Sequence, residues 1–502
     1  MKRLFVFAIG GTGSRVLKSL AMLLAAGVRT NQQSDYEVIP IIVDPHKSND
    51  DLKRTVDLLR VYGKIAEHAT LDGRGFFGTK IKTLDKITSS AERHGSSFTF
   101  QLQEVSNSRF RDYIEADLMQ PANRALTELL FSGTTHSKRG DKVDLLDIEM
   151  EIGFVGNPNV GSVVLNQFSE SREFKDFASN FNESDRIFII SSIFGGTGAA
   201  GFPVILKNLR DAMNLKDVDA KGFLQNAKIG SLTVMPYFNV ESDGKSAIKR
   251  GDFISKTRAA LHYYQENVTG NNSVNAMYYI ADPYHGKAYK NDPGYGGQRN
   301  DAHFVELASA LAIIDFMGMH DDMLRTTNGI AEEPVYKEFA VRNDKESLVF
   351  NDLSDETLSL IRAQMTKMSM FVEFMRDTRF HETIGSPDDW MKEKPQITPE
   401  FIGSTFVQSH LQEFIQLYLD WLEELSRNRR GFAPFNIGNI ENLIADLAPK
   451  SSWLRPFTFE RFRETLNEVT KKPTGSTPET KLLDVLHQAA TQILARYYDI
   501  KG

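Results

Sequence analysis

Three glycine-rich turns in this chain have the composition of phosphate-binding loops. The clearest lies within residues 191–205, SSIFGGTGAAGFPVI, where small residues separate a strand-like run from a helix-like one. Such a turn exposes backbone N–H groups at a helix N-terminus, and helix N-termini bind phosphate. Glycine also permits sharp turns and close packing, so a single turn leaves both interpretations open. The residues concerned are Gly10, Gly11, Thr12, Gly13 and Ser14, then Gly156, Asn157 and Pro158, and finally Gly195, Gly196, Thr197 and Gly198.

An acid that follows a second strand-like run completes the predicted constellation. Asp44 ends the run VIPIIVD at 38–44. Ligands of an open parallel sheet bind outside the carboxyl ends of its strands, so we expect Asp44 and the three turns to share one rim. There, backbone N–H groups would cradle a triphosphate, Thr12 and Thr197 would add hydroxyl donors, and Asp44 would hold Mg²⁺ through water. The alternative is that the glycines serve only the close packing of helices on strands.

Other common phosphate-binding and catalytic motifs do not fit the chain. A P-loop requires a lysine at a fixed spacing after its glycines, and none follows these turns. A dinucleotide fingerprint that starts at Gly11 would need its third glycine where Val16 stands. The motifs H-E-x-x-H and G-x-S-x-G are also missing. A dinucleotide or nucleotide-sugar enzyme on a Rossmann-like sheet is therefore the weakest functional hypothesis.

Alternating strand-like and helix-like segments predict an α/β fold with a mostly parallel, Rossmann-like sheet over residues 1–320. Residues 45–150 alternate less clearly, and we expect a partly helical insertion there. Residues 302–318 are apolar almost all round, which predicts a buried helix. Continuous apolar runs, typical of buried parallel strands, occur at 4–9, 38–44, 186–193, 229–238 and 275–282.

A different pattern begins after about residue 330. Short strand-like runs and then amphipathic helices predict a separate α+β or helical C-terminal domain at 330–470. A final helix is expected at 479–502. One helix in this region carries an apolar stripe formed by Leu411, Phe414, Ile415, Tyr418 and Leu422.

Composition excludes several classes of function. With 502 residues, the chain exceeds the usual size of one core, so two or more domains are expected. The formal net charge of −7 argues against nucleic-acid binding driven by bulk charge. The absence of cysteine excludes disulfides and thiolate metal sites, and it fits a reducing compartment. The longest apolar window is too short to span a bilayer, and we expect a cytoplasmic protein.

Together, the turns resemble the phosphate loops of the tubulin/FtsZ superfamily of GTP-binding proteins, specifically a divergent bacterial tubulin-like branch. Residues 194–200, FGGTGAA, are similar to the signature G-G-G-T-G-[ST]-G. Residues 10–15, GGTGSR, are similar to the FtsZ-type loop G-G-G-G-S-N, with Arg15 in place of asparagine. Residues 156–161, GNPNVG, resemble the third loop, G-A-N-P-x-[VI]-G. The resemblance covers about residues 1–320, and the loops occur in the order of the family.

This resemblance implies bound GTP or GDP with Mg²⁺, and it assigns residues to the nucleoside. Glu241 would approach the ribose, and Asp282 would accept from the N1–H and N2–H groups of guanine. The helix at 302–318 would be the long central helix of the superfamily. Phe304 would then stack on the base, with His303 as second candidate. A core role for Phe304 is an equal alternative.

The resemblance also implies that the chain assembles with itself, head to tail, into cytoskeletal filaments or oligomers. GTP would then be hydrolysed at the interfaces between subunits. Asp321 and Asp322 are the local acids after the central helix, but they do not reproduce the N-x-D-x-x-D spacing of FtsZ. A second hypothesis therefore keeps nucleotide binding without hydrolysis. In it, the chain is a nucleotide-gated scaffold or regulatory partner in a bacterial multi-protein system, and the stripe through Leu411 docks another protein.

Overall fold

The structure is a computed structural model of the 502-residue chain. It describes residues 2–500 apart from 31–35, 47–48, 70–74, 89–97, 101, 106–107, 137–141, 151–153, 155, 217, 219, 238, 241–249, 283–287, 290–299, 339–344, 384–386, 429, 451–455 and 471–474.

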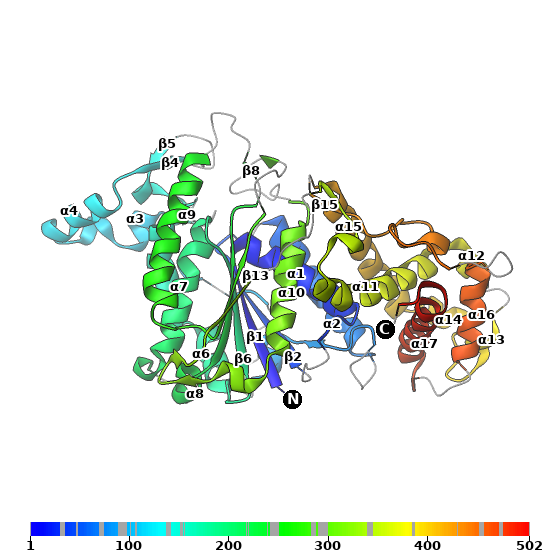
Figure 1. Ribbon diagram of the computed structural model, residues 1–502. Coiled ribbons are helices and arrows are strands. Elements are labelled where there is room, and N and C mark those ends of the chain that lie inside the picture. The colour runs from blue at the N-terminus through cyan, green and yellow to red at the C-terminus, as the bar shows by residue number, and fades with distance from the viewer. Residues whose placement is uncertain are drawn as a thin grey trace.

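A seven-stranded parallel sheet forms the centre of the molecule (Figure 1). Its strand order is β13-β9-β7-β6-β1-β2-β3, and each neighbouring pair is parallel. The predicted Rossmann-like α/β fold is therefore confirmed. The strands are β1 (Lys2–Ile9), β2 (Tyr36–Val43), β3 (Lys80–Ile81), β6 (Arg186–Ser192), β7 (Lys228–Val234), β9 (Ala276–Ile280) and β13 (Val335–Glu338).

Helices cover both faces of this sheet, which explains why its strands are apolar without alternation. All residues of β1 from Leu4 to Ile9 are buried. Phe5 and Phe7 contact the ring of Phe177 on one face. That face carries α5 (Pro158–Leu165), α6 (Arg172–Asn180), α7 (Gly196–Arg210) and α9 (Arg250–Tyr264), and the other carries α1 (Gly10–Ala25), α2 (Asp50–Ala66) and α10 (Phe304–Gly318) (Figure 1). No described helix combines the length and apolarity needed to cross a bilayer.

The strand order reverses between β1 and β6. From β1 the chain proceeds outward through β2 to β3, whereas from β6 it proceeds in the opposite direction through β7 and β9 to β13. Crevices at such a switch point, outside the carboxyl ends of the strands, are where open α/β sheets bind ligands. The turns at 10–14 and 195–198 follow the two strands that flank this point.

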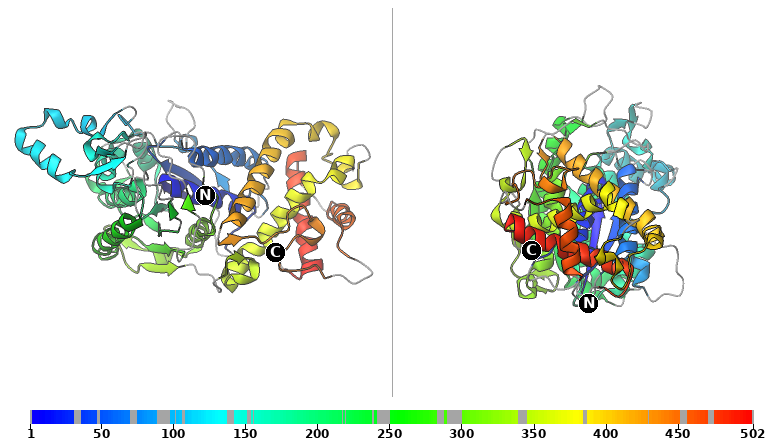
Figure 2. Two further views of the ribbon diagram at one scale, coloured as in Figure 1. Left: turned by 90° about the horizontal axis from the view of Figure 1, so that it is seen from above. Right: turned by 90° about the vertical axis from the view of Figure 1, so that its right-hand side faces the viewer.

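Two segments differ from the expected domain pattern. The strand β13 lies beyond residue 320, yet it is the edge strand of the central sheet. Within 45–150, α2 and β3 make an ordinary crossover beside β2. The described part of 102–150 projects away from the sheet, and we call it the arm (Figures 1 and 2). It contains α3 (Phe110–Tyr113), α4 (Pro121–Leu130), β4 (Thr134–His136) and β5 (Lys142–Asp144).

The C-terminal region is mainly helical and packs beside α1 and α2 (Figure 2). Its stripe on α15 and the preceding turn is buried within the chain: Phe414 packs its ring 4.7 Å from that of Phe77, and Tyr418 lies 3.2 Å from the Ser369 hydroxyl. The expectation that this stripe docks another protein is therefore wrong, because the chain itself covers it. The longest helices are α11 (Asp355–Arg376), α15 (Gln412–Arg427), α16 (Phe459–Val469) and α17 (Pro478–Ile493).

One buried carboxylate, Glu424 on α15, connects this region to the sheet domain. Its Oε2 accepts from Lys18 Nζ at 2.8 Å, and its Oε1 accepts from Arg54 Nη1 at 2.5 Å. The backbone N–H of Ala302, just before α10, also donates to Oε2 at 3.1 Å. Burial raises the pKa of Glu424, but the two cations outweigh burial and hold its pKa below the ordinary value.

We predict that Glu424→Gln lowers the free energy of unfolding by about 2–4 kcal/mol near neutral pH, because the buried Lys18 and the half-buried Arg54 lose their shared counter-charge. The folded pKa of Glu424 is lowered, so its stabilisation is present above the unfolded pKa of about 4.3 and is lost as the pH falls. The difference in free energy of unfolding between the variant and wild type should therefore become smaller in acid, as measured by chemical denaturation.

The matched control is Glu423→Gln, one residue away. Glu423 is exposed and pairs only loosely with Arg427, at 3.4 Å, so its loss should change stability by less than about 0.5 kcal/mol. Equal destabilisation by the two variants would contradict the role given to Glu424.

Candidate functional site

The three glycine turns meet at the carboxyl edge of the sheet. A Cβ built on Gly10 would lie 3.5 Å from the Cβ of Thr197. A Cβ on Gly196 would lie 3.1 Å from the backbone nitrogens of both Gly156 and Asn157. The predicted juxtaposition of the turns is thus present, and we call this junction the rim.

Three helices begin at the rim without a side-chain cap. Ile9 and Gly195 precede α1 and α7, and the Asn157 side chain before α5 donates to Phe154 O at 3.1 Å instead of capping. Side chains do cap several other described helices, among them α2, α6, α11, α16 and α17, through Asn49, Ser171, Ser354, Thr458 and Thr477. The positive ends of three helix dipoles therefore converge where no described side chain caps them, which favours a bound polyanion.

Different physical constraints require glycine at different positions of the rim. A Cβ on Gly13 would lie 2.6 Å from the carbonyl carbon of Ala8, and one on Gly198 would lie 2.7 Å from Ser192 O, so both positions need glycine for packing. Gly10 has φ +70°, which favours glycine on backbone grounds.

Neither close packing nor backbone conformation requires a glycine at Gly11. It lacks a positive φ, and a Cβ there would meet only the side-chain nitrogens of Arg15 and Asn49, at an ordinary 3.6 Å. Packing and backbone conformation therefore explain part of the glycine pattern, whereas no contact among the described residues requires a glycine at position 11.

Asp44 lies beside the first turn, since Val43 pairs with Ile9 in the sheet register. The carboxylate is buried and accepts from the His46 N–H at 3.0 Å. Burial raises the pKa of Asp44 to about 7; the His46 hydrogen bond opposes the shift, and Asp51 adds to it. A nearby cation would restore the charge of this carboxylate, and hydrated Mg²⁺ takes only one or two carboxylates. The described residues contain no cluster of three acidic or histidine side chains that could hold a metal by themselves.

A buried charge network borders the rim, and sequence reasoning did not anticipate it. The Arg15 guanidinium donates from Nε to Glu306 Oε1 at 2.6 Å and from Nη2 to Tyr237 Oη at 2.8 Å. Its Nη1 lies 3.1 Å from Asp51 Oδ2. The Tyr237 hydroxyl donates to the same Glu306 oxygen at 2.6 Å. This network connects α1, α2, the segment after β7 and the start of α10, so the elements that border the rim are held together by charge.

Only a weak signal in the sequence marks this network. Glu306 stands three residues after His303 and accepts from its backbone N–H at 3.0 Å, which is capping-box spacing. Arg15 stands out only as the replacement for the family asparagine. Its pairing with Asp51 and Glu306 depends on the fold, because no local pattern joins the three.

The residues assigned to the base and ribose are not all gathered at the rim, and two of them contact the C-terminal region instead. Both oxygens of Asp282 accept from Arg430 Nε, at 2.8 and 2.9 Å. Phe304 is buried, with its ring 5.5 Å from that of Phe432 in the C-terminal region. Glu241 lies outside the described residues.

His303, the second candidate for the base, is closer to the network. Its ring lies 5.0 Å from that of Tyr237. Burial lowers the pKa of His303 to about 3, with smaller effects from Arg15 and Arg430, so the imidazole is neutral at physiological pH. The assignments of Asp282, Phe304 and Glu241 remain predictions.

Asp321 and Asp322 lie at the amino edge of the sheet, opposite the rim. Asp321 accepts from Lys2 Nζ at 2.8 Å and Arg186 Nη2 at 2.7 Å, and Lys228 Nζ lies 3.2 Å away. Burial raises the pKa of Asp321, but these cations outweigh burial and hold it well below the ordinary value. Asp322 is exposed and lies 3.0 Å from His320 Nδ1.

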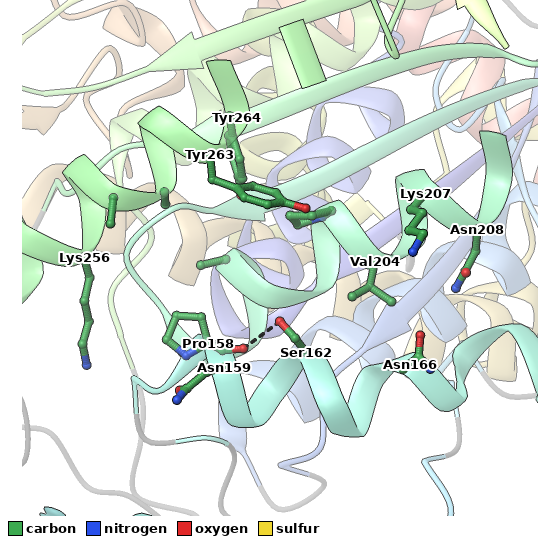
Figure 3. Close-up of a pocket in the computed structure, with 14 residues that line it drawn as sticks. Pro158, Asn159, Ser162, Asn166, Val204, Lys207, Asn208, Lys256, Tyr263 and Tyr264 are labelled. Atoms are coloured by element: carbon green, nitrogen blue, oxygen red, sulfur yellow. Dashed lines mark hydrogen bonds between the residues drawn. The ribbon is translucent and has the colours of Figure 1, made fainter. Parts of the chain in front are cut away.

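A groove of about 510 Å³ runs from the rim between α5, α7 and α9 (Figure 3). Lys256 and Lys207 contribute to its lining, and none of the described residues that line it is acidic. Lys256 Nζ donates to Gly156 O at 2.6 Å. This ammonium group adds positive charge directly beside the second glycine turn.

Comparison with known proteins gives only loose matches. No protein-family model matches the sequence, and no curated protein is detectably similar to it. CetZ from Methanosaeta thermophila strain DSM 6194 is similar over 56% of this chain and 46% of its own length, with 11% identity and a TM-score of 0.26. TubZ of Clostridium botulinum phage c-st, truncated at its C-terminal tail, is similar over 72% of this chain and 75% of its own length, with 12% identity and a TM-score of 0.29. TM-scores this low assign neither family nor function, so any functional assignment depends on the rim itself.

We predict that Asp44→Asn changes the pH dependence of stability. The folded pKa of about 7 exceeds the unfolded value, so protonation stabilises the fold and stability falls as the pH rises from about 4 to 7. The variant should exceed wild type in free energy of unfolding by about 1–4 kcal/mol near pH 8, and the difference should vanish near pH 4.

Thermal and chemical denaturation across this pH range checks the prediction. Asp57→Asn, which removes an exposed acid from α2, is the control and should change the free energy of unfolding by less than about 0.5 kcal/mol. A constant offset between Asp44→Asn and wild type at every pH would contradict the raised pKa.

Proposed function

We propose that this chain is a GTP-binding protein of the tubulin/FtsZ type whose bound nucleotide controls its self-assembly into filaments or oligomers. The observation that carries the proposal is the convergence of three uncapped helix N-termini at the switch point of a parallel sheet. A triphosphate is the ligand that fits this convergence best, because it presents several negative oxygens to several N–H groups at once.

The donors present fit the phosphates and their metal. The backbone of the turns at 10–14, 156–158 and 195–198 would hold the phosphate oxygens, with the hydroxyls of Thr12 and Thr197 beside them. Asp44 would hold Mg²⁺ through water, because a cation nearby favours the charged form of this buried carboxylate. When bound, Mg²⁺ neutralises phosphate charge.

The base and ribose would lie beyond the first turn, towards the charge network. Asp282 is proposed as the guanine acceptor, which requires that it exchange Arg430 for the N1–H and N2–H groups of the base. Phe304 or the neutral His303 is proposed to stack on the base, and Glu241 to approach the ribose.

Head-to-tail assembly is supported by the placement of the acids. Asp322 is exposed at the amino edge, whereas the rim lies at the carboxyl edge. A contact between opposite edges is heterologous, and contacts of this kind propagate into open polymers unless they close into a ring.

A second candidate function follows from Asp321. Three cations, Lys2, Arg186 and Lys228, already surround its carboxylate, so it is poorly placed to orient water on another subunit. This favours a nucleotide-gated scaffold that binds GTP without hydrolysis. Release of inorganic phosphate on assembly would support the GTPase, and assembly without release would support the scaffold.

We predict that Gly11→Asp weakens GTP binding about 100-fold or more, because it places a negative charge next to the phosphates. An acid in the first turn of α1 is compatible with the helix dipole, so the fold should remain intact. Equilibrium titration of nucleotide-stripped protein with GTP and ATP, with and without Mg²⁺, measures the change.

Gly63→Asp provides the matched control. Gly63 lies in α2, and no atom comes within 4 Å of a Cβ built there. This variant carries the same change of charge and should bind GTP like wild type. Equal affinity in Gly11→Asp and Gly63→Asp, both folded, would contradict phosphate binding at the rim.

A further inference from the structure

We propose that the arm of one copy seats on the amino edge of the next copy and forms the contact that sets the direction of assembly. The inference deepens the proposed self-assembly and rests on it for the head-to-tail arrangement. It identifies the contact surfaces, which the nucleotide site alone does not.

The arm carries an apolar surface that the chain leaves uncovered. Four leucines on and beside α4 are between 54% and 80% exposed, and none of the ten residues of this helix is buried. Leu126, Leu129 and Leu130 follow the i, i+3, i+4 spacing that places side chains on one helix face. We call this surface the leucine face, and it consists of Leu118, Leu126, Leu129 and Leu130.

The amino edge carries a second exposed apolar set. Its residues are 46% to 55% exposed. Phe223 lines a hollow of about 800 Å³, whose lining also includes Leu324, next to Met323 in the chain, and Thr327, which pairs with Ile330. We call this set the apolar border, and it consists of Met213, Phe223, Met323 and Ile330.

The two surfaces account for eight of the twelve large exposed apolar side chains in the described residues. Scattered single apolar residues are normal on a surface, but clusters of this kind mark interaction sites. One cluster lies level with the carboxyl ends of the strands and the other at their amino ends. Both lie on the same side of the sheet, with α4 at upper left and α8 (Lys221–Gln225) at lower left in Figure 1. Figure 1 thus places the arm and the amino edge at opposite ends of the strands, as a head-to-tail contact between copies requires.

The charged groups around the two surfaces are compatible with this contact. Arg124 and Glu128 flank the leucine face, and the hollow offers exposed groups of both signs, including Asp322 and Arg325. The second copy is the occupant that the structure favours, because the same chain supplies both surfaces at opposite ends. A symmetric contact between two arms would cover only one surface and leave the apolar border exposed.

Cross-linking between two single-cysteine proteins tests the contact directly. The chain contains no cysteine, so introduced thiols are the only ones that react. Leu129→Cys protein is mixed with Phe223→Cys protein and treated with a flexible bis-maleimide, with and without GTP and Mg²⁺. We expect about tenfold more cross-linked dimer in the mixture than in either protein alone, because a specific contact raises the effective concentration of the two thiols.

Ile437→Cys is the matched control, since Ile437 is exposed but belongs to neither surface. Mixtures that contain it should give only background cross-linking. As much dimer from Leu129→Cys alone as from the mixture would overturn the proposal in favour of a symmetric arm contact. Equal cross-linking to Ile437→Cys would overturn it as non-specific.

GTP titration of the same samples separates this proposal from the proposed function. Cross-linking that persists in protein that binds no GTP would uphold the arm contact and refute the nucleotide site. Protein that binds GTP and assembles without arm cross-links would overturn the arm contact alone. Leu129→Glu and Phe223→Glu should each stop assembly, and their mixture should give dimers only, because one intact pair of surfaces remains.

Discussion

The close approach of α1 to β1 and of α7 to β6 is the constraint on which the rest of the site depends. Gly13 and Gly198 permit it, because any side chain there would collide with the backbone of the preceding strand. Two helices can therefore start directly at the ends of adjacent strands, with α5 brought against α7 through Gly196. The result is a concentration of positive helix ends at one point of the sheet. The glycines required for packing thus create the space in which the proposed nucleotide would approach the other glycines of the rim.

Ion pairs hold together the helices that surround the rim. Arg15 joins Asp51, Glu306 and Tyr237 beside the rim, and Glu424 joins Lys18 and Arg54 one layer further out. Buried pairs of this kind are costly to break on one side only. The C-terminal region is therefore fixed to the same helices, α1 and α2, that border the proposed nucleotide.

Local pattern accounts for most of the sheet domain. The apolar runs at 4–9, 38–44 and 186–193 predicted buried parallel strands, and the helices on both faces explain why these runs do not alternate. The meeting of the three turns also followed from sequence, because parallel strands place their carboxyl ends at one edge. By contrast, the sequence did not place β13 in this sheet, because β13 is a short edge strand and most of its residues are exposed and polar.

The side-chain chemistry around the rim was less accessible to sequence reasoning. Asp51 and Glu306 pair with Arg15 although they lie 36 and 291 residues away in the sequence, and no local spacing predicts such pairs. Asp282 appeared suited to a base, yet Arg430 from the C-terminal region already pairs with it. The stripe on α15 had the periodicity of a docking face, and periodicity cannot tell whether the surface that covers it belongs to the same chain.

Hydrogen exchange with GTP and Mg²⁺ added to stripped protein tests the central claim most directly, namely that three helix ends jointly bind one polyphosphate. If the three turns bind one polyphosphate, the amides at 10–13, 156–161 and 195–198 become protected together, at one GTP concentration. Protection of a single turn, or protection confined to segments away from the rim, would contradict it.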